Sequence, residues 1–575
     1  MRTNCNMMTR QTGNPVWLCV CLLLIVGLMG GFGPQTAQAQ GKPFMLPVAL
    51  PPGPSTWLLG QPYGNTAGAF LRGQDWYRAG QRLHFGLDLS MPCGTPLVAI
   101  GDGEVVAVDD LSFGSAPHNL LIRHDAGYVS LYGHLLERPS LVNGQRVTRG
   151  QEVARSGDPD ITCDSRPHLH LEIRSLDYRT AYNPVDVIDA AWQTLALVGP
   201  FRYPLFQQDL NNARRWLTQD DQPTVAFGGA ALNAYTATFP APEAYAAPPT
   251  APNGTQNAGS LPAGWTLRRL AFDGCCANAE WHPSAGNLLY LTDGAPGQAA
   301  AVFEWDVTGT APTGVVLPAP LPLRSPDGSY TTAMRDGRAL IRRAADGAEW
   351  PVETRGAVPA TSPANDRLMW LEASGVALPG ETAPSVTLWV SGIDGANPSQ
   401  IAAAAGLNAM WLDDGRLLLS QRTQALTSLY VHDLASGQTS PLGAFNWLRS
   451  LSAAPGGGRL VFMIVYQDDP SVSGIYTMDT QPGAAAQRLP WFGGWRWRDA
   501  DELYSVPLDT EAARAAGSHQ LRHYDLTTGI DSALTDPAAQ PFVIAEGDWS
   551  VSADGARIAF WNALDRTVWL LEPQA

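Results

Sequence analysis

The chain has 575 residues, which is too long for one hydrophobic core, so we expect two or more domains. Its formal net charge of −16 argues against nucleic acid as a partner, because nucleic-acid-binding proteins present basic faces. With 57 glycines, 46 prolines, 19 tryptophans and only 16% charged residues, the composition favours turn-rich β structure over helical bundles.

The first forty residues have the pattern of a signal peptide. Arg2 and Arg10 give a basic start, residues 16–29 form an uncharged apolar run, and the Ala-Gln-Ala of residues 37–39 offers a small-x-small cleavage site. A retained membrane anchor is the alternative, although the apolar run is at the lower limit for crossing a bilayer. We therefore expect residues 1–39 to be removed, leaving a secreted or envelope protein with no membrane span.

Residues 40–56 are rich in proline and are predicted to form an extended lead-in. Between residues 57 and 190 the sequence alternates short apolar runs with glycine-containing turns, which is typical of antiparallel sheet. The clearest predicted strands are 96–100, 104–108, 119–123 and 128–132. This segment is predicted to be a small β domain.

Histidines concentrate in this β domain. Six of the ten lie between residues 84 and 172, and four of those six fall in three short motifs. Residues two or four apart in a strand face the same side, so His84 and Asp88 can meet one ion, as can His168 and His170. A hydrolytic zinc needs three protein ligands and an open position for water. Together with His134, these residues predict a zinc site.

The motif order resembles a known family. His-x-x-x-Asp, Tyr-x-His-Leu and His-x-His-x-Glu follow one another as in the lysostaphin/LytM-type zinc endopeptidases, peptidase family M23. The resemblance implies that His84, Asp88 and His170 bind Zn²⁺ and that His134 and His168 are catalytic. It also implies a secreted zinc metalloendopeptidase that hydrolyses peptide bonds of bacterial cell-wall peptidoglycan. An inactive envelope scaffold, which binds peptidoglycan or a protein partner through another domain, is the alternative.

The implied ligand set agrees with hydrolytic chemistry. Two imidazoles and one carboxylate leave zinc a position for water, whose pKa the ion lowers toward about 7. His134 and His168 then orient that water, take its proton or stabilise the oxyanion, and the sequence does not divide these roles between them. Glu172 is either a hydrogen-bond acceptor behind a ligand or an exposed strand residue, and we favour the exposed residue.

Four cysteines follow the leader, namely Cys93, Cys163, Cys275 and Cys276, and in an oxidising compartment they allow three pairings. Cys93 follows the first histidine motif and Cys163 precedes the last one. If these motifs share one metal, the two cysteines come close, so we predict a disulfide between them. Cys275 and Cys276 are then a vicinal pair or two free thiols. Four buried thiols are the alternative.

The rest of the chain is predicted to be a second β domain. Residues 191–238 are a connecting segment and 239–262 a Pro/Ala-rich linker, because this composition cannot build a core. From 263 to 575, a turn followed by an apolar strand recurs seven times at a spacing of about forty residues, the period of a propeller blade. These copies resemble TolB-type and WD40-like propellers. We therefore expect an all-β protein with a C-terminal seven-bladed β-propeller, whose ligand, protein or glycan, the sequence does not identify.

Overall fold

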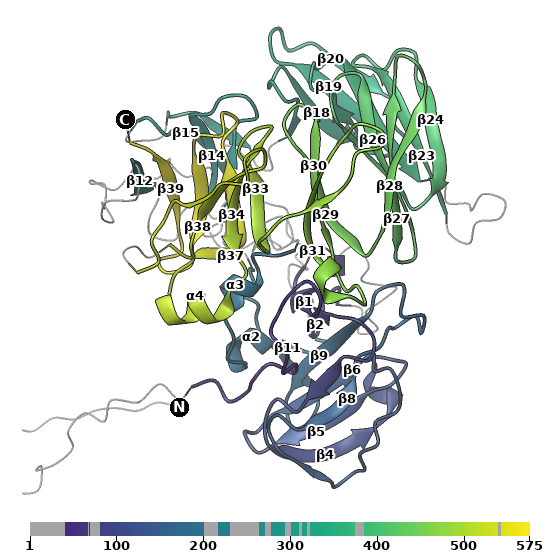
Figure 1. Cartoon of the computed structure of the whole chain (residues 1–575), viewed down its shortest axis with the longest axis vertical. Helices are drawn as coiled ribbons and strands as arrows, with labels where there is room; N and C mark the ends of the chain where they lie inside the picture. Colours follow the sequence, from purple (N-terminus) through teal and green to yellow (C-terminus); the bar gives the residue numbers. More distant parts are fainter. Residues whose placement is uncertain are drawn as a thin grey trace, which may run out of the picture.

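The computed structural model describes residues 41–66, 68–69, 81–199, 217–229, 264–270, 278–293, 301–309, 313–318, 322–373, 384–538 and 542–574. In these residues the regular structure is nearly all β, arranged as a small N-terminal domain and a larger ring of sheets (Figure 1). The predicted fold class is confirmed. The predicted signal peptide and linker, together with Cys275 and Cys276, lie outside the described residues. Among the described residues, no helix has the length and apolarity to span a bilayer.

The N-terminal domain is built on one antiparallel sheet. Its strands lie in the order β1 (Leu58–Leu59), β2 (Leu87–Ser90), β9 (His168–Arg174), β6 (Val129–Gly133), β5 (Leu120–His124), β4 (Gly103–Val108) and β7 (Arg146–Val147). β10 (Thr180–Tyr182) pairs with β9 and with β11 (Val225–Ala226), while β3 (Pro96–Val98) and β8 (Glu152–Arg155) form a separate ribbon. Each of the four predicted strands has an observed counterpart.

Alternation along β9 sets the two faces of this sheet. Leu169, Leu171 and Ile173 are fully buried in a core that also takes in Phe44 from the proline-rich lead-in and Trp192. Because successive side chains of a strand point to opposite faces, residues 168, 170 and 172 face the other way. The polar residues of the last histidine motif therefore share one side of the sheet.

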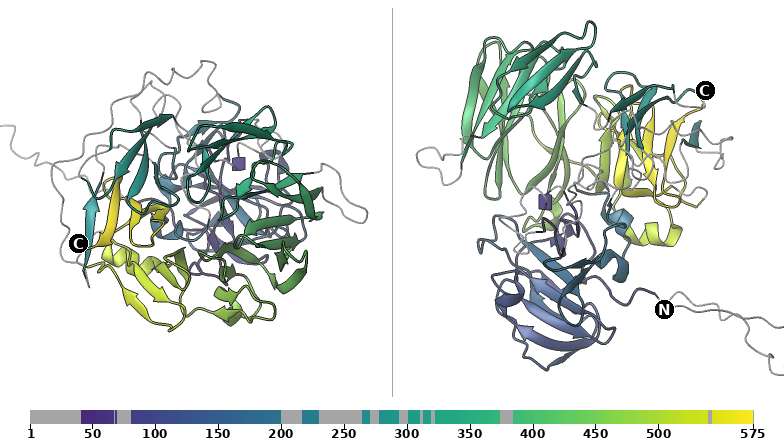
Figure 2. Two further views of the ribbon diagram at one scale, coloured as in Figure 1. Left: turned by 90° about the horizontal axis from the view of Figure 1, so that it is seen from above. Right: turned by 180° about the vertical axis from the view of Figure 1, so that it is seen from behind.

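The C-terminal part is a ring of seven four-stranded antiparallel sheets, which confirms the predicted seven-bladed propeller (Figure 2). The first three sheets are β13 (Asn278–Trp281), β14 (Leu288–Asp293), β15 (Ala301–Asp306) and β16 (Val316–Pro318); β17 (Leu323–Arg324), β18 (Tyr330–Arg335), β19 (Arg338–Arg343) and β20 (Glu349–Val352); and β21 (Ala360–Thr361), β22 (Arg367–Ala373), β23 (Ser385–Gly392) and β24 (Ser399–Ala405). The next three are β25 (Leu407–Trp411), β26 (Arg416–Thr423), β27 (Leu426–Asp433) and β28 (Thr439–Asn446); β29 (Leu448–Ala453), β30 (Arg459–Ile464), β31 (Gly474–Asp479) and β32 (Gln487–Arg488); and β33 (Gly493–Trp497), β34 (Glu502–Pro507), β35 (Arg522–Asp525) and β36 (Asp531–Ala533).

The seventh sheet closes the ring by joining the two ends of the propeller. It consists of β37 (Ile544–Val551), β38 (Ile558–Asn562), β39 (Thr567–Pro573) and the early strand β12 (Trp265–Arg269). β12 pairs with β39 in antiparallel register from Trp265 opposite Pro573 to Arg269 opposite Trp569. Because this sheet takes strands from both ends of the propeller, it holds the ring closed, and each blade leaves only a short edge.

The recurring turns explain the repeat in the sequence. At residues 325–328, the Ser325 hydroxyl donates to Asp327 and accepts from the Tyr330 amide, and Gly328 turns the chain with φ 76°. The turn at Ser552, Asp554 and Gly555 repeats the Ser–Asp hydrogen bond and the positive φ. Each residue type has a structural task in the turn, so the motif marks a blade and not a site.

The two domains are packed against each other. Short helices α2 (Pro184–Val187) and α3 (Trp192–Leu195) leave the N-terminal domain, and α4 (Thr510–Ala516) lies beside them on the propeller (Figure 1). Two 3₁₀ turns, Leu111–Phe113 and Pro470–Val472, complete the regular structure of the described residues. The Tyr466 hydroxyl donates to the Ser90 carbonyl at 2.7 Å, and Leu197 is buried in the propeller core. The histidine-bearing edge of the small domain thus lies against the propeller.

Candidate metal centre

His84, Asp88 and His170 come together although 86 positions separate the two histidines. β2 and β9 are antiparallel neighbours with Asp88 directly opposite His170, and His84 is placed by a bridge to Gly64. His84 Nε2 lies 3.1 Å from His170 Nδ1 and 3.1 Å from Asp88 Oδ1, and His170 Nδ1 lies 2.9 Å from the same oxygen. The three predicted ligands therefore form a compact triangle of donor atoms.

This triangle fits a zinc ion. Zinc binds imidazole nitrogen and carboxylate oxygen at about 2.0–2.2 Å, so two donors of a tetrahedral site lie about 3.3 Å apart. The observed separations of 2.9–3.1 Å need to open by only a few tenths of an ångström. Both histidines are nearly buried, at 2% exposure for His84 and 8% for His170, which favours a fixed site over a chance surface cluster.

Hydrogen bonds behind the ligands decide which nitrogen faces the ion. His84 Nδ1 donates to the Pro62 carbonyl at 2.8 Å, which leaves the Nε2 lone pair for a metal. His170 Nε2 donates to Glu172 Oε1 at 3.1 Å, which leaves Nδ1. Gly86 makes this approach possible, since a Cβ there would lie 2.7 Å from His170 Cε1. Any larger residue at position 86 would therefore collide with the imidazole of His170, which explains the glycine in the first histidine motif.

Glu172 corrects an expectation. We favoured an exposed strand residue, but its side chain is buried and hydrogen-bonded to His170, and Arg174 Nε donates to its second oxygen at 2.6 Å. Although burial opposes ionisation, Arg174 and His170 lower the pKa of Glu172 to about 2. Its place two residues after His170 on one strand face was the signal that could have identified it.

The carboxylates and histidines of the site stabilise one another's charged forms. Burial disfavours an ionised Asp88, yet the charges of His84 and His168 and the hydrogen bond from His170 hold its pKa well below the usual range. Burial likewise opposes protonation of His170, but its hydrogen bonds to Asp88 and Glu172 raise its pKa to about 9. A bound cation would take the place of the His170 proton, so metal binding and proton release are linked.

The other two predicted residues stand beside the triad. His134 directly follows β6 with φ 55°, and its ring centroid lies 4.8 Å from that of His168. Nδ1 of His134 donates to the Ala116 carbonyl, and Nδ1 of His168 donates to the Arg166 carbonyl at 2.6 Å. Burial, and then the charges of His168 and His170, lower the pKa of His134 to about 3. At both residues, Nε2 is left as the atom that exchanges a proton.

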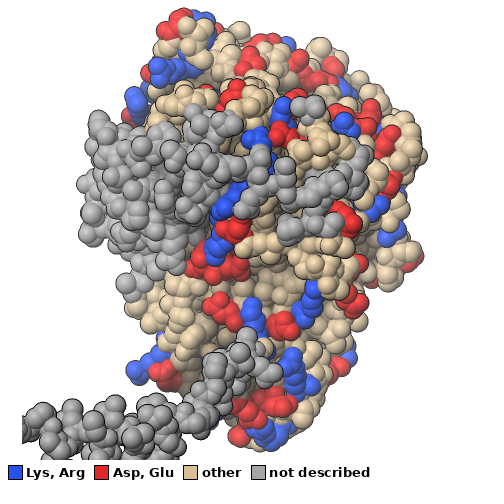
Figure 3. Space-filling view, turned by 90° about the vertical axis from the view of Figure 1, so that its left-hand side faces the viewer, with Lys and Arg blue, Asp and Glu red and all other residues tan. Residues whose placement is uncertain are grey.

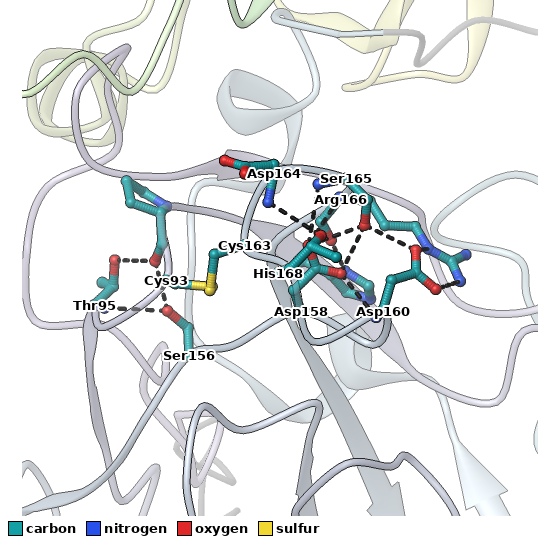
Figure 4. The surroundings of a disulfide bond; sticks show 12 residues. Cys93, Thr95, Ser156, Asp158, Asp160, Cys163, Asp164, Ser165, Arg166 and His168 are labelled. Carbon is teal, nitrogen blue, oxygen red and sulfur yellow. Dashed lines mark hydrogen bonds and ion pairs between the residues drawn. A yellow bond between two sulfur atoms is a disulfide. The ribbon is translucent and has the colours of Figure 1, made fainter. Parts of the chain in front are cut away.

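The predicted disulfide is confirmed. Cys93 and Cys163 are bonded, and Figure 4 shows the bridge beside the loop that leads into β9. In that loop, Asp158 accepts hydrogen bonds from the Ser165 hydroxyl and from three backbone amides, and Arg166 pairs with Asp160. The disulfide and this network fix the segment that precedes His168.

A cavity of about 1570 Å³ contains all five residues, and its walls come from both domains. From the N-terminal domain it takes the histidines, Asp88 and the segment around residues 111–116. From the propeller it takes side chains of β26, β29 and β33. The space in front of the triad is therefore bounded by the small domain and by the propeller.

Comparison with known proteins identifies the small domain. Residues 82–185 match the family model described as peptidase family M23, so this part of the chain is an M23 peptidase domain. Peptidoglycan DD-endopeptidase ShyA of Vibrio cholerae is 37% identical over 90 residues, covering 16% of this chain and 20% of that protein. Glycyl-glycine endopeptidase ALE-1 of Staphylococcus capitis is 31% identical over 110 residues, or 19% of this chain and 30% of that protein.

Among solved structures, TolB from Acinetobacter baumannii aligns with 48% of this chain and 77% of its own, at 15% identity and a TM-score of 0.27. The seven observed sheets, and not this likeness, establish the propeller. The match to ShyA and to ALE-1 spans under a third of the length of each of these relatives.

Proposed function

We propose that the chain is an exported zinc metalloendopeptidase that hydrolyses peptide bonds of bacterial cell-wall peptidoglycan, with a propeller that binds or targets the substrate. The observation that carries this proposal is the convergence of five side chains, three of them a zinc-sized donor set, in one cavity of an M23 domain. The names of the two relatives, one a peptidoglycan endopeptidase and one a glycyl-glycine endopeptidase, support this class of substrate. Export rests on the leader pattern of residues 1–39.

In this mechanism His84, Asp88 and His170 would hold a zinc ion, which would supply a Lewis acid and make the attacking water more acidic. His134 is neutral at pH 7, and its Nδ1 proton is engaged by Ala116, so its Nε2 accepts a hydrogen bond and orients the attacking water. Nδ1 of His168 also donates to a backbone carbonyl, that of Arg166, and its Nε2 lies 3.7 Å from Asp88 Oδ1. His168 serves as the second proton-exchanging group. Glu172 keeps His170 in the ligating tautomer.

The proposal is tested by incubating the purified full chain with labelled peptidoglycan, with and without a chelator, and by measuring bound zinc. We expect about one zinc per chain and release of label that the chelator stops. His84→Ala removes both, whereas His118→Ala, which alters a histidine of the same domain paired with Asp109 outside the cavity, removes neither. Zinc-free protein that binds peptidoglycan without cutting it would favour the inactive scaffold.

A further inference from the structure

The propeller forms part of the wall of the peptidase cavity. Arg422 on β26, Arg449 on β29, and Trp495 and Trp497 on β33 all line the space that contains the metal-binding triad. These residues come from three neighbouring sheets, which face the small domain in both side views (Figures 1 and 2). One side of the cavity is therefore formed by the M23 domain and another side by the propeller.

The charge of this cavity is opposite to that of the chain. Among the described residues, five arginines line it against two acidic residues, Asp88 and Glu172, whereas the whole protein has a net charge of −16. Asp88 is held by the histidines, and Glu172 by His170 and Arg174. On the outer face shown in Figure 3 the two signs of charge are interspersed. The excess of positive charge is thus a feature of the cavity.

Two of these arginines, Arg422 and Arg449, stand out because no carboxylate in the described part of the chain lies within ion-pair distance of either guanidinium. Arg166 and Arg174, by contrast, pair with Asp160 and Glu172. Partial desolvation, and then the charge of Arg449, lower the pKa of Arg422, as expected for two cations that share a site without an anion.

Both guanidiniums are anchored next to His168. Arg449 Nη2 donates to the Ser90 hydroxyl at 2.9 Å, and Ser90 is the residue opposite His168 across the β2–β9 pair. Arg422 Nη2 donates to the carbonyl of Ser165, three residues before His168, at 3.0 Å, and its Nε donates to the Gln424 carbonyl. A guanidinium has five N–H donors, so each arginine keeps donors for a ligand.

We propose that Arg422 and Arg449 form a carboxylate-binding site through which the propeller holds an acidic peptide while a neighbouring peptide bond lies at the metal centre. The planar fork of arginine matches the two oxygens of a carboxylate, and two such forks beside His168 define one end of the bound peptide. The site deepens the proposed function and rests on it, since it assigns the propeller a part in substrate recognition. Its ligand is a peptide with free carboxylates, such as a peptidoglycan stem peptide.

A purely structural role for the two arginines is the competing explanation, because their hydrogen bonds to Ser90 and Ser165 join the two domains. The two explanations differ in one observable. A structural role affects all peptides equally, whereas a carboxylate site discriminates a peptide with free carboxylates from its amide.

The test measures binding of two fluorescent stem tetrapeptides, one with free carboxylates and one fully amidated, to the chelator-treated full chain. Hydrogen bonds to charged groups predict at least about a tenfold weaker binding of the amide to the unaltered protein. In Arg422→Gln and in Arg449→Gln, the ratio of the two dissociation constants is expected to fall toward one. In Arg422→Lys and in Arg449→Lys, we expect a ratio between that value and the ratio of the unaltered protein. Arg338→Gln, which removes an exposed arginine of β19 paired with Glu353, keeps the full ratio.

Cleavage of peptidoglycan by the zinc-loaded protein is followed in parallel, so that the two proposals fail separately. If the protein cleaves peptidoglycan but binds both peptides equally, the carboxylate site is wrong and the proposed peptidase activity stands. The same conclusion follows if both glutamine variants still prefer the peptide with free carboxylates. No cleavage and no binding of either peptide overturns both. Displacement of the free-carboxylate peptide by a poly(glycerol phosphate) at a lower concentration than by the unlabelled peptide assigns the site to a phosphate polymer and overturns the inference.

Discussion

Replacing Glu172 by glutamine tests whether a buried carboxylate prepares His170 for a metal. In the structure, Glu172 accepts from His170 Nε2 at 3.1 Å and from Arg174 Nε at 2.6 Å, and it is 5% exposed. Glutamine keeps the size of the side chain but removes its charge. The imidazole then loses the charged acceptor that fixes its tautomer and raises its basicity.

Loss of such an acceptor typically weakens metal binding about 10–100-fold, which corresponds to about 1.4–2.7 kcal/mol. The same substitution leaves Arg174 as a buried cation without its partner, which adds a cost in stability. The double variant Glu172→Gln/Arg174→Gln removes that second effect. We expect the double variant to regain thermal stability but not zinc affinity.

Zinc affinity is measured by competition with a chromogenic chelator, with Glu152→Gln as the control. Glu152 pairs with Arg155 at 3.2 Å on the exposed surface of the same domain, where an ion pair contributes about 0–1 kcal/mol. The control is expected to bind zinc as the unaltered protein does. If Glu172→Gln also bound zinc with unaltered affinity, the role assigned to this carboxylate would be wrong.

Three further predictions concern catalysis, the disulfide and pH. His134→Ala is expected to lower kcat by about 10²–10⁴-fold but to retain zinc, because the proposed ligands are His84, Asp88 and His170; loss of zinc on dialysis would place His134 in the metal site instead. Cys93→Ser with Cys163→Ser frees a loop of 70 residues and lowers the free energy of unfolding of the small domain by up to about 4 kcal/mol, measured by denaturant titration; an unchanged midpoint would contradict this. Burial, and then Asp220, raise the pKa of Glu546 to about 8, so the native state holds a proton that the unfolded state loses above about 4.5. Glu546→Gln therefore stabilises the protein by about 1–3 kcal/mol at pH 7, and the gain disappears as the pH falls toward 4.5; a gain that is independent of pH would refute this origin.

The sequence predicted the elements that carry local signals. Histidines and an aspartate at strand spacing predicted a metal site, and the resemblance to family M23 implied which three of them are the ligands. These residues meet because β2 and β9 are neighbours with Asp88 opposite His170. The propeller was predictable because each blade repeats a Ser–Asp–Gly turn whose residue types the turn requires. The disulfide between Cys93 and Cys163 was predictable because the two histidine motifs beside these cysteines were expected to share one ion.

What the sequence could not predict depends on contacts between distant segments. Glu172 looks like any charged strand residue until Arg174 and His170 are seen to enclose it. Nothing local in residues 265–269 indicates that this strand completes a sheet with β39, more than 290 positions later. Arg422 and Arg449 carry no motif, and only the packing of the propeller against the small domain places them in the peptidase cavity.

The central claim, that this cavity hydrolyses peptide bonds with zinc, is tested most directly by mass spectrometry of defined muropeptides after digestion with the full chain. The account predicts products that gain one water at a peptide bond, formed by the zinc-loaded protein, absent after chelation and restored by added zinc. It also predicts no products from His84→Ala or His170→Ala. Products that form equally well in chelator, or in either of these variants, would contradict it.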